Sequence, residues 1–206
     1  MKIQALAVGQ LAANCYLVID EATNAAVIID PGDAPEEIEA AVCAAGADVK
    51  HILFTHGHPD HVFSAGEVQK VFDVYALMHE ADVPQFGEYK DLVATLFDPA
   101  RYIPPRLGEF LKDGDVLHIG ETEFKVIHTP GHSPGGLCFA SGSIIFTGDT
   151  LFAGTTGRTD LLGGSLDDLT LSIHQKLLIL PDDTVIYPGH GPSSTIGAEK
   201  AGNIWL

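Results

Sequence analysis

The most constraining feature of the sequence is a cluster of histidines and one aspartate directly after a short apolar run. Residues 52–54 predict a β-strand, and four potential metal ligands follow at His56, His58, Asp60 and His61. A turn that leads from a strand into a helix can aim these side chains at one point. Neutral imidazole and carboxylate suit Zn²⁺, Fe²⁺ or Mn²⁺ far better than Ca²⁺ or Mg²⁺. The cluster therefore predicts a transition-metal site at a strand end.

Three later segments repeat this arrangement of a short apolar strand followed by a ligand-type residue next to glycine. These residues are His132 after the predicted strand 123–128, Asp149 after 144–146 and His190 after 185–187. Glycine lets the backbone turn sharply at a strand end and bring distant side chains to a shared site. Each segment alone is weak evidence, but the four together predict one composite site.

The number of candidate ligands indicates more than one metal ion. The set contains seven side chains, whereas a catalytic zinc takes three from the protein. Two ions that share one carboxylate would use all seven and leave positions for water. Water between two cations loses its proton near neutral pH and becomes a hydroxide nucleophile. We therefore expect two divalent ions, zinc first and iron or manganese as alternatives, and hydrolysis of an acyl bond by a metal-bridging hydroxide.

The apolar pattern predicts strands in two clusters with helices between them. The expected strands occupy residues 3–8, 15–19, 25–29, 52–54, 74–78, 116–119, 123–128, 137–140, 144–146 and 185–187. We expect a helix from an Asp33 N-cap to Gly46, a second over residues 61–71, and a third that Ser165 caps. Residues 80–110 contain a further helix interrupted by prolines and are hard to interpret. The pattern predicts an α+β fold, one domain over residues 1–206, with two central sheets and helices outside.

Composition excludes several classes of function. The net charge of −17 disfavours binding to a phosphate backbone, so we expect a small-molecule partner and no nucleic acid. No apolar run reaches the ~20 residues of a membrane span, and the N-terminal segment is too polar for a signal peptide, so we expect a cytoplasmic protein with no membrane partner. Cys15, Cys43 and Cys138 form no C-x-x-C pair, and each is expected to be buried. The sequence gives no indication of oligomeric state.

The ligand pattern resembles that of the metallo-β-lactamase superfamily over nearly the whole chain. Segments 148–152, 157–160 and 188–191 are similar to those of the glyoxalase II group, the hydroxyacylglutathione hydrolases and their short bacterial relatives. The resemblance implies a four-layer αββα sandwich with the metals at one edge of the two sheets. It implies a first metal on His56, His58 and His132, a second on Asp60, His61 and His190, and Asp149 as the bridge. Asp60 and Asp149 would also orient the metal-bound water.

Other residues have more than one interpretation. Asp30 matches a position that supports the ligands from behind, or it is a plain turn residue before Pro-Gly. Arg158 and Asp160 stand where the glutathione enzymes carry a Lys and a Tyr that hold glutathione. Arg158 could bind a substrate carboxylate or form a structural ion pair with Asp160. Tyr187 could face the substrate or belong to the core.

The resemblance implies hydrolysis of a small thioester, most similar to S-acylglutathione. Because the chain ends at Leu206, the helical domain that completes the glutathione site in the longer enzymes is expected to be absent. The alternatives are a persulfide dioxygenase with one iron, a lactonase-type metallohydrolase, and a metal-binding domain without turnover. The dioxygenases also carry a Gly-Arg-Thr-Asp segment like that of residues 157–160, but they usually vary the residues around the last ligand histidine.

Overall fold

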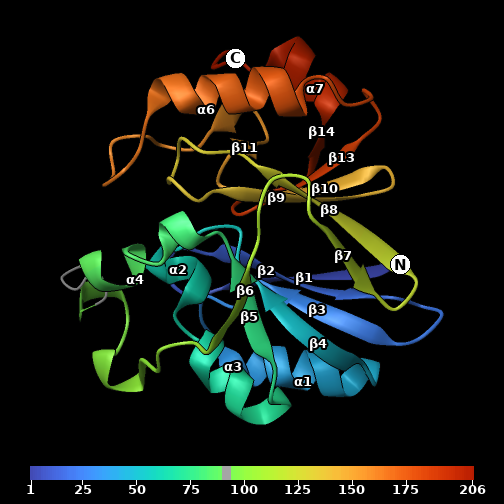
Figure 1. The fold of residues 1–206 in the computed structure, drawn as a ribbon, viewed down its shortest axis with the longest axis vertical. Coiled ribbons are helices and arrows are strands. Elements are labelled where there is room, and N and C mark those ends of the chain that lie inside the picture. Colours follow the sequence, from blue (N-terminus) through green and yellow to red (C-terminus); the bar gives the residue numbers. More distant parts are fainter. Residues whose placement is uncertain (90–93) are drawn as a thin grey trace.

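Two six-stranded sheets lie face to face in the middle of the molecule, and helices cover both outer faces (Figure 1). The computed structural model describes residues 1–89 and 94–206. The first sheet has the order β1-β2-β3-β4-β5-β6, formed by Lys2–Val8, Ala13–Ile19, Ala25–Ile29, Asp48–Leu53, Tyr75–Met78 and Leu107–Phe110. The second has the order β14-β13-β10-β9-β8-β7, with β7 Val116–Ile119, β8 Thr122–His128, β9 Leu137–Ser141, β10 Ile144–Gly148, β13 Val185–Pro188 and β14 Ser194–Thr195. The short hairpin β11–β12 (Leu151–Phe152 and Thr155–Thr156) follows β10.

The helices complete the four layers. Helices α1 (Pro35–Ala45) and α3 (Ala65–Phe72) lie on the outer side of the first sheet (Figure 1). Helix α6 (Leu166–Ser172), which continues into the π-helical turn η3 (Ile173–Leu177), and α7 (Ile196–Gly202) cover the second (Figure 1). The expected αββα sandwich is therefore confirmed.

Burial on both faces of the first sheet explains its apolar strands. In β2, Leu17 packs toward α1 and α3, and its neighbour Val18 packs between the sheets against residues such as Phe139 and Phe146. Successive side chains of a strand point to opposite faces, so a strand covered on both sides is apolar throughout. All seven residues of β2 are buried accordingly.

Two helix predictions and one burial prediction need correction. The helix expected over residues 61–71 is two helices, α2 (Pro59–Val62) and α3, because the N–H of Ser64 donates to the carbonyl of Pro31 at 3.2 Å. Ala34, in a left-handed conformation, is the N-cap of α1. The carboxylate of Asp33 accepts the adjacent N–H of Ala34 and pairs with Arg101 instead of capping the helix. Cys43 is exposed because it lies on the outer side of α1, whereas Cys15 and Cys138 are buried.

The described residues between 80 and 110 form short elements. They are η1 (Glu80–Asp82), α4 (Gln85–Glu88), a helical stretch at residues 94–96, η2 (Pro99–Arg101) and β6, which pairs in parallel with β5. Residues 90–93, within the region of the expected helix, lie outside the described residues. Ser165 caps α6 as predicted, and its hydroxyl accepts the N–H of Asp168 at 3.2 Å. No helix in the described ranges is long and apolar enough to cross a bilayer.

Candidate metal centre

The candidate ligands follow strand ends of both sheets. His56 and His58 lie in the loop after β4, and Asp60 and His61 lie in the helix α2 that follows it. The second sheet contributes His132 after β8, Asp149 after β10 and His190 after β13. The fold therefore brings together residues that are up to 134 positions apart, as 190 − 56 gives.

The ligand atoms form two groups that the aspartate Asp149 connects. In each of two sets, His56 with His58 and His132, and Asp60 with His61 and His190, all ligand atoms lie within 4.8 Å of one another. Asp149 Oδ2 lies 3.5 Å from His132 Nε2 in the first group, and its Oδ1 lies 3.5 Å from His61 Nε2 in the second. This position between the groups is the one that a bridging ligand needs.

Each of the five imidazoles directs one nitrogen into the cluster while a protein group holds the other. The outward nitrogens pair as follows: His56 Nδ1 with Thr55 Oγ1, His58 Nε2 with the Tyr89 hydroxyl, His61 Nδ1 with Asp30, His132 Nδ1 with the Arg158 carbonyl, and His190 Nδ1 with the Leu11 carbonyl. A carbonyl or carboxylate accepts only an N–H, so the inward nitrogens of neutral His61, His132 and His190 are left as lone pairs. Metal-binding histidines are oriented in this way.

Two buried atoms show that the site suits a metal ion. His56 Nε2 and Asp149 Oδ1 are inaccessible to solvent and have no hydrogen-bond partner among the described residues. Leaving such a group unpaired costs about 1–3 kcal/mol. Both atoms are metal-ligand types that face the other ligands, so a divalent cation would satisfy them.

The protonation of the cluster differs between the two groups. Burial lowers the pKa of His56 well below its usual value, and burial together with His132 lowers the pKa of His58 to about 3. Burial also opposes the charged form of His61, but the carboxylates of Asp60, Asp149 and Asp30 outweigh it and raise its pKa to about 10. Without metal, the second group thus holds a proton where a cation would sit, and metal binding must displace it.

Asp30 orients two of the candidate ligands through hydrogen bonds, so it is not only a turn residue. Its side chain is buried and accepts the N–H and the hydroxyl of Thr55 at 2.7 and 2.6 Å and the Nδ1–H of His61 at 3.0 Å. Because Thr55 in turn contacts His56, one carboxylate orients a ligand of each group. Asp30 adopts a φ of 53°, in the left-handed region.

The two predicted substrate-binding residues lie in different surroundings, Arg158 at the hollow and Tyr187 in the core. Arg158 lies at the hollow over the metal ligands, where its guanidinium forms a two-point ion pair with Asp160 at 2.7 Å for both contacts. Tyr187 does not line that hollow; its ring stacks on Phe146 at 5.3 Å and meets Tyr16 edge to face in the core between the sheets. Of the two interpretations of Tyr187, this packing supports a position in the core.

A hollow of about 610 Å³ opens over the candidate ligands. The candidate ligands among its lining residues are His58, Asp60, His132, Asp149 and His190, and the other lining residues include Leu11, Tyr89, Leu96, Phe152, Thr156 and Leu161. The volume fits a small-molecule site. Sequence reasoning missed Tyr89, Leu11 and the role of the Arg158 carbonyl, because no spacing marks a wall residue or a backbone atom.

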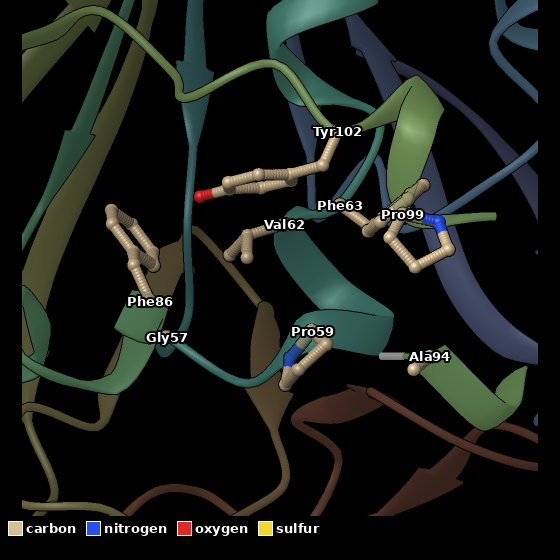
Figure 2. A pocket seen from close by; sticks show the side chains of 8 residues that line it. All are labelled: Gly57, Pro59, Val62, Phe63, Phe86, Ala94, Pro99 and Tyr102. Atoms are coloured by element: carbon tan, nitrogen blue, oxygen red, sulfur yellow. The ribbon is translucent and has the colours of Figure 1, made fainter. Parts of the chain in front are cut away.

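A second cavity, of about 370 Å³, lies beside the ligand loop (Figure 2). Pro59 lines both this cavity and the hollow over the metal ligands. The other labelled residues are almost all apolar, with Val62 on α2, Phe86 on α4, and Pro99 and Tyr102 from the segment that precedes β6 (Figure 2). The helix that carries Asp60 and His61 therefore has an incompletely filled apolar space on one side.

Comparison with known proteins agrees with this geometry. A family model of the metallo-beta-lactamase superfamily matches residues 8–190. Hydroxyacylglutathione hydrolase GloC of Haemophilus influenzae is 38% identical over 216 residues, 100% of this chain and 98% of that protein. The solved structure of TTHA1623 in a di-iron-bound form has a TM-score of 0.86 at 36% identity and covers 98% of this chain and 100% of its own. The B3 metallo-beta-lactamase BLEG-1 has a TM-score of 0.81 at 31% identity over 98% of both chains. The chain belongs to the metallo-β-lactamase superfamily.

Proposed function

We propose that this protein is a hydrolase that uses two divalent metal ions to cleave a small thioester of the S-acylglutathione type. The observation that carries the proposal is the orientation of the five histidines. Each has one nitrogen held by the protein and one directed into the cluster, with Asp149 between the two groups. Zinc is the first expectation for both ions, and the di-iron form of TTHA1623 supports iron as an alternative.

The chain's own residues hold and orient the reactants. Bound at these ligands, divalent ions would polarise the substrate carbonyl and supply a nucleophile from water at neutral pH. Asp60 and Asp149 present carboxylates to the hollow, where they would orient the attacking water toward the carbonyl. None of the described residues that line the hollow is a serine or cysteine, so a metal-dependent attack by water is the route that fits these residues.

Two observations support a thioester of a small anionic thiol as the substrate. GloC, whose name gives hydroxyacylglutathione as its substrate, is similar over the full length of this chain. Arg158 lines the hollow, and its guanidinium is paired with Asp160. A substrate carboxylate would replace Asp160 as the partner of this guanidinium. The partner is therefore a small molecule.

The test is hydrolysis of S-D-lactoylglutathione by protein of measured metal content, with and without a chelator. We expect turnover that chelation abolishes and that Zn²⁺, Fe²⁺ or Mn²⁺ restores. His58→Ala, which removes a ligand, should abolish turnover as well.

Other results would contradict the proposal in distinguishable ways. Turnover of lactones without any thioester hydrolysis would indicate a lactonase. Oxygen uptake with a persulfide by protein that holds one iron would indicate a dioxygenase. If His58→Ala changed only stability and no turnover, the catalytic hypothesis would fail.

A further inference from the structure

Asp82 is a fully buried carboxylate in η1, outside the motifs that supply the candidate ligands. It accepts hydrogen bonds from the Gly57 N–H at 2.9 Å, from the Ser133 hydroxyl at 2.7 Å and from the Gly135 N–H. Hydrogen bonds to a charged acceptor are stronger than those between neutral groups. The three donors therefore fix the position of two backbone segments relative to this one side chain.

The two segments are the loops that carry ligands of the first group. Gly57 lies between His56 and His58 in the loop after β4, and Ser133 directly follows His132 in the loop after β8. The inward nitrogens of His58 and His132 lie only 2.8 Å apart. Asp82 thus joins a loop of the first sheet to a loop of the second at the point where these two rings meet.

The backbone is packed closely around Asp82. A Cβ added at Gly57 would lie 2.7 Å from the carbonyl oxygen of Asp82, and a Cβ added at Gly135 would lie 2.7 Å from its carboxyl carbon. Such contacts are too short for any residue other than glycine without movement of the loop. Both loops therefore approach Asp82 as closely as the backbone allows.

We propose that Asp82 is a positioning residue of the metal centre that sets the separation of His58 and His132 through the backbone of their loops. The proposal rests on the metal centre of the proposed function, and it assigns different supporting carboxylates to different candidate ligands. Asp30 orients His61 directly and His56 through Thr55, whereas Asp82 acts on the other two ligands of the first group. Loss of Asp82 should therefore weaken the first site and spare Asp60, His61 and His190.

The experiment is a Co²⁺ titration of metal-free Asp82→Asn followed by visible absorption, with competition by Zn²⁺. We expect one of the two sites to bind about 10–100-fold more weakly, the range for groups that orient metal ligands. The absorption spectrum of Co²⁺ at that site should also change, because the spectrum reports ligand geometry. The affinity of the other site should stay within about 2-fold of wild type.

Asp20→Asn is the matched control. Asp20 is also a buried carboxylate, and it accepts hydrogen bonds from the N–H and hydroxyl of Thr23 and from the hydroxyl of Thr122, away from the candidate ligands. Asp20→Asn should lower thermal stability without changing either metal affinity or the Co²⁺ spectrum. Equal weakening of metal binding in both variants would show that Asp82 contributes only general stability and would overturn the proposal.

Ser133→Ala keeps the proposal testable if Asp82→Asn does not fold. It removes one of the three hydrogen bonds and should weaken the first site by a smaller factor, with the same spectral change. Folded variants that bind both ions as wild type does would overturn the proposal. A wild-type protein that binds two Co²⁺ ions but hydrolyses no thioester would reject only the proposed substrate, and one that binds no metal would reject both.

Discussion

At the scale of single residues, the candidate metal centre depends on groups that never contact a metal. Asp30 carries the largest share, because its two oxygens accept from Thr55 and from His61 while the residue itself is almost fully buried. An amide in its place would offer one acceptor and would turn an N–H₂ group toward existing donors. The orientation of His61 and, through Thr55, of His56 would be lost together.

We expect Asp30→Asn to lower kcat/KM about 10–100-fold and to reduce bound metal, because the orientation of metal ligands carries an effect of that size. Metal analysis and thioester turnover measure the two effects. Asp33→Asn is the control on the same loop, since Asp33 forms an ion pair of 3.5 Å with Arg101 and lies outside the cluster. Equal activity in the two variants would contradict the role given to Asp30.

Arg158 permits a test between its two interpretations. If it binds a substrate carboxylate, Arg158→Ala should raise KM about 10-fold, the equivalent of ~1.4 kcal/mol, with metal content unchanged because the backbone carbonyl still holds His132. Asp160→Asn frees the guanidinium and should lower KM. If the pair is structural only, neither variant changes KM in initial-rate measurements. Stability should change little in either variant, because both side chains are more than 60% exposed, at 63% and 67%.

Residue spacing was sufficient to predict which side chains converge, but it could not predict what holds them. The ligand types His56, His58, Asp60 and His61 are close in sequence, and each later ligand follows a strand next to glycine. The carbonyls of Leu11 and Arg158 that orient His190 and His132 are backbone atoms, so residue type carries no information about them. Asp82 was missed because no motif surrounds it and its three donors lie 25 to 53 positions away.

At the scale of elements, aromatic packing holds the segment before β6 against the α2–α3 pair. Phe63 lies in the turn between the two helices and is 1% exposed. Its ring stacks on Phe97 with centroids 4.4 Å apart and lies 5.6 Å from the ring of Tyr102. Phe63 also lines the apolar cavity, so part of its surroundings is already empty (Figure 2).

We expect Phe63→Ala to destabilise the protein by about 3–5 kcal/mol, because the truncation enlarges an existing cavity that its neighbours do not fill. Denaturant unfolding measures the change in the free energy of unfolding. Phe110→Ala is the control, since Phe110 on β6 is 39% exposed and should cost less than about 1 kcal/mol. A Phe63→Ala cost as small as that of the control would show that the segment is not anchored through this ring.

Short apolar runs predicted most strands of the two sheets, and long-range contacts explain the elements that they missed. β6 has the sequence Leu-Gly-Glu-Phe and no buried residue, so it contains no apolar run. The helix over residues 61–71 is interrupted because Ser64 bonds to Pro31, 33 positions earlier. Leu166 is 65% exposed at the first turn of α6, so an apolar residue in a helix does not by itself indicate burial.

At the scale of the whole molecule, the two sheets are joined at a point other than the metal centre. Asp20, at the end of β2, accepts from Thr23 in the following turn and from Thr122, the first residue of β8 in the second sheet. These hydrogen bonds from Thr23 and Thr122 lower the pKa of Asp20 to about 2. The charged carboxylate therefore contributes to the contact between the sheets.

The lowered pKa of Asp20 predicts a pH-dependent contribution to stability. A carboxyl whose pKa is lower in the folded state stabilises the protein above its unfolded pKa, about 3.9, and loses that contribution as pH falls toward 2. Asp20→Asn should therefore unfold at a lower temperature than wild type at pH 7, and the difference should narrow between about pH 4 and 2. Thermal unfolding at a series of pH values measures this. A difference that stays constant over that interval would contradict the assignment.

The arrangement of two sheets was predictable because strands occur in two clusters along the sequence, each with enough apolar residues to cover a face. The order of strands was not predictable in the same way. β13 pairs in parallel with β10 after the α6 crossover, and β3, β4, β5 and β6 run parallel. These pairings bring the carboxyl ends of the strands to one edge, which is why ligands distant in sequence meet there.

The hollow over the ligands is built from two kinds of segment, and the difference bears on how new activities could arise. The ligands follow strand ends of the two large sheets. Leu11, Leu96 and Leu161 reach the hollow from segments between strands, and Phe152 reaches it from the short hairpin β11–β12 outside those sheets. Connecting segments tolerate sequence change better than strands do. A library that varies these four positions alone would sample many substrate preferences while every clone keeps the metal ligands. Directed evolution of this fold could therefore change the residues that contact the substrate while the candidate metal ligands stay the same.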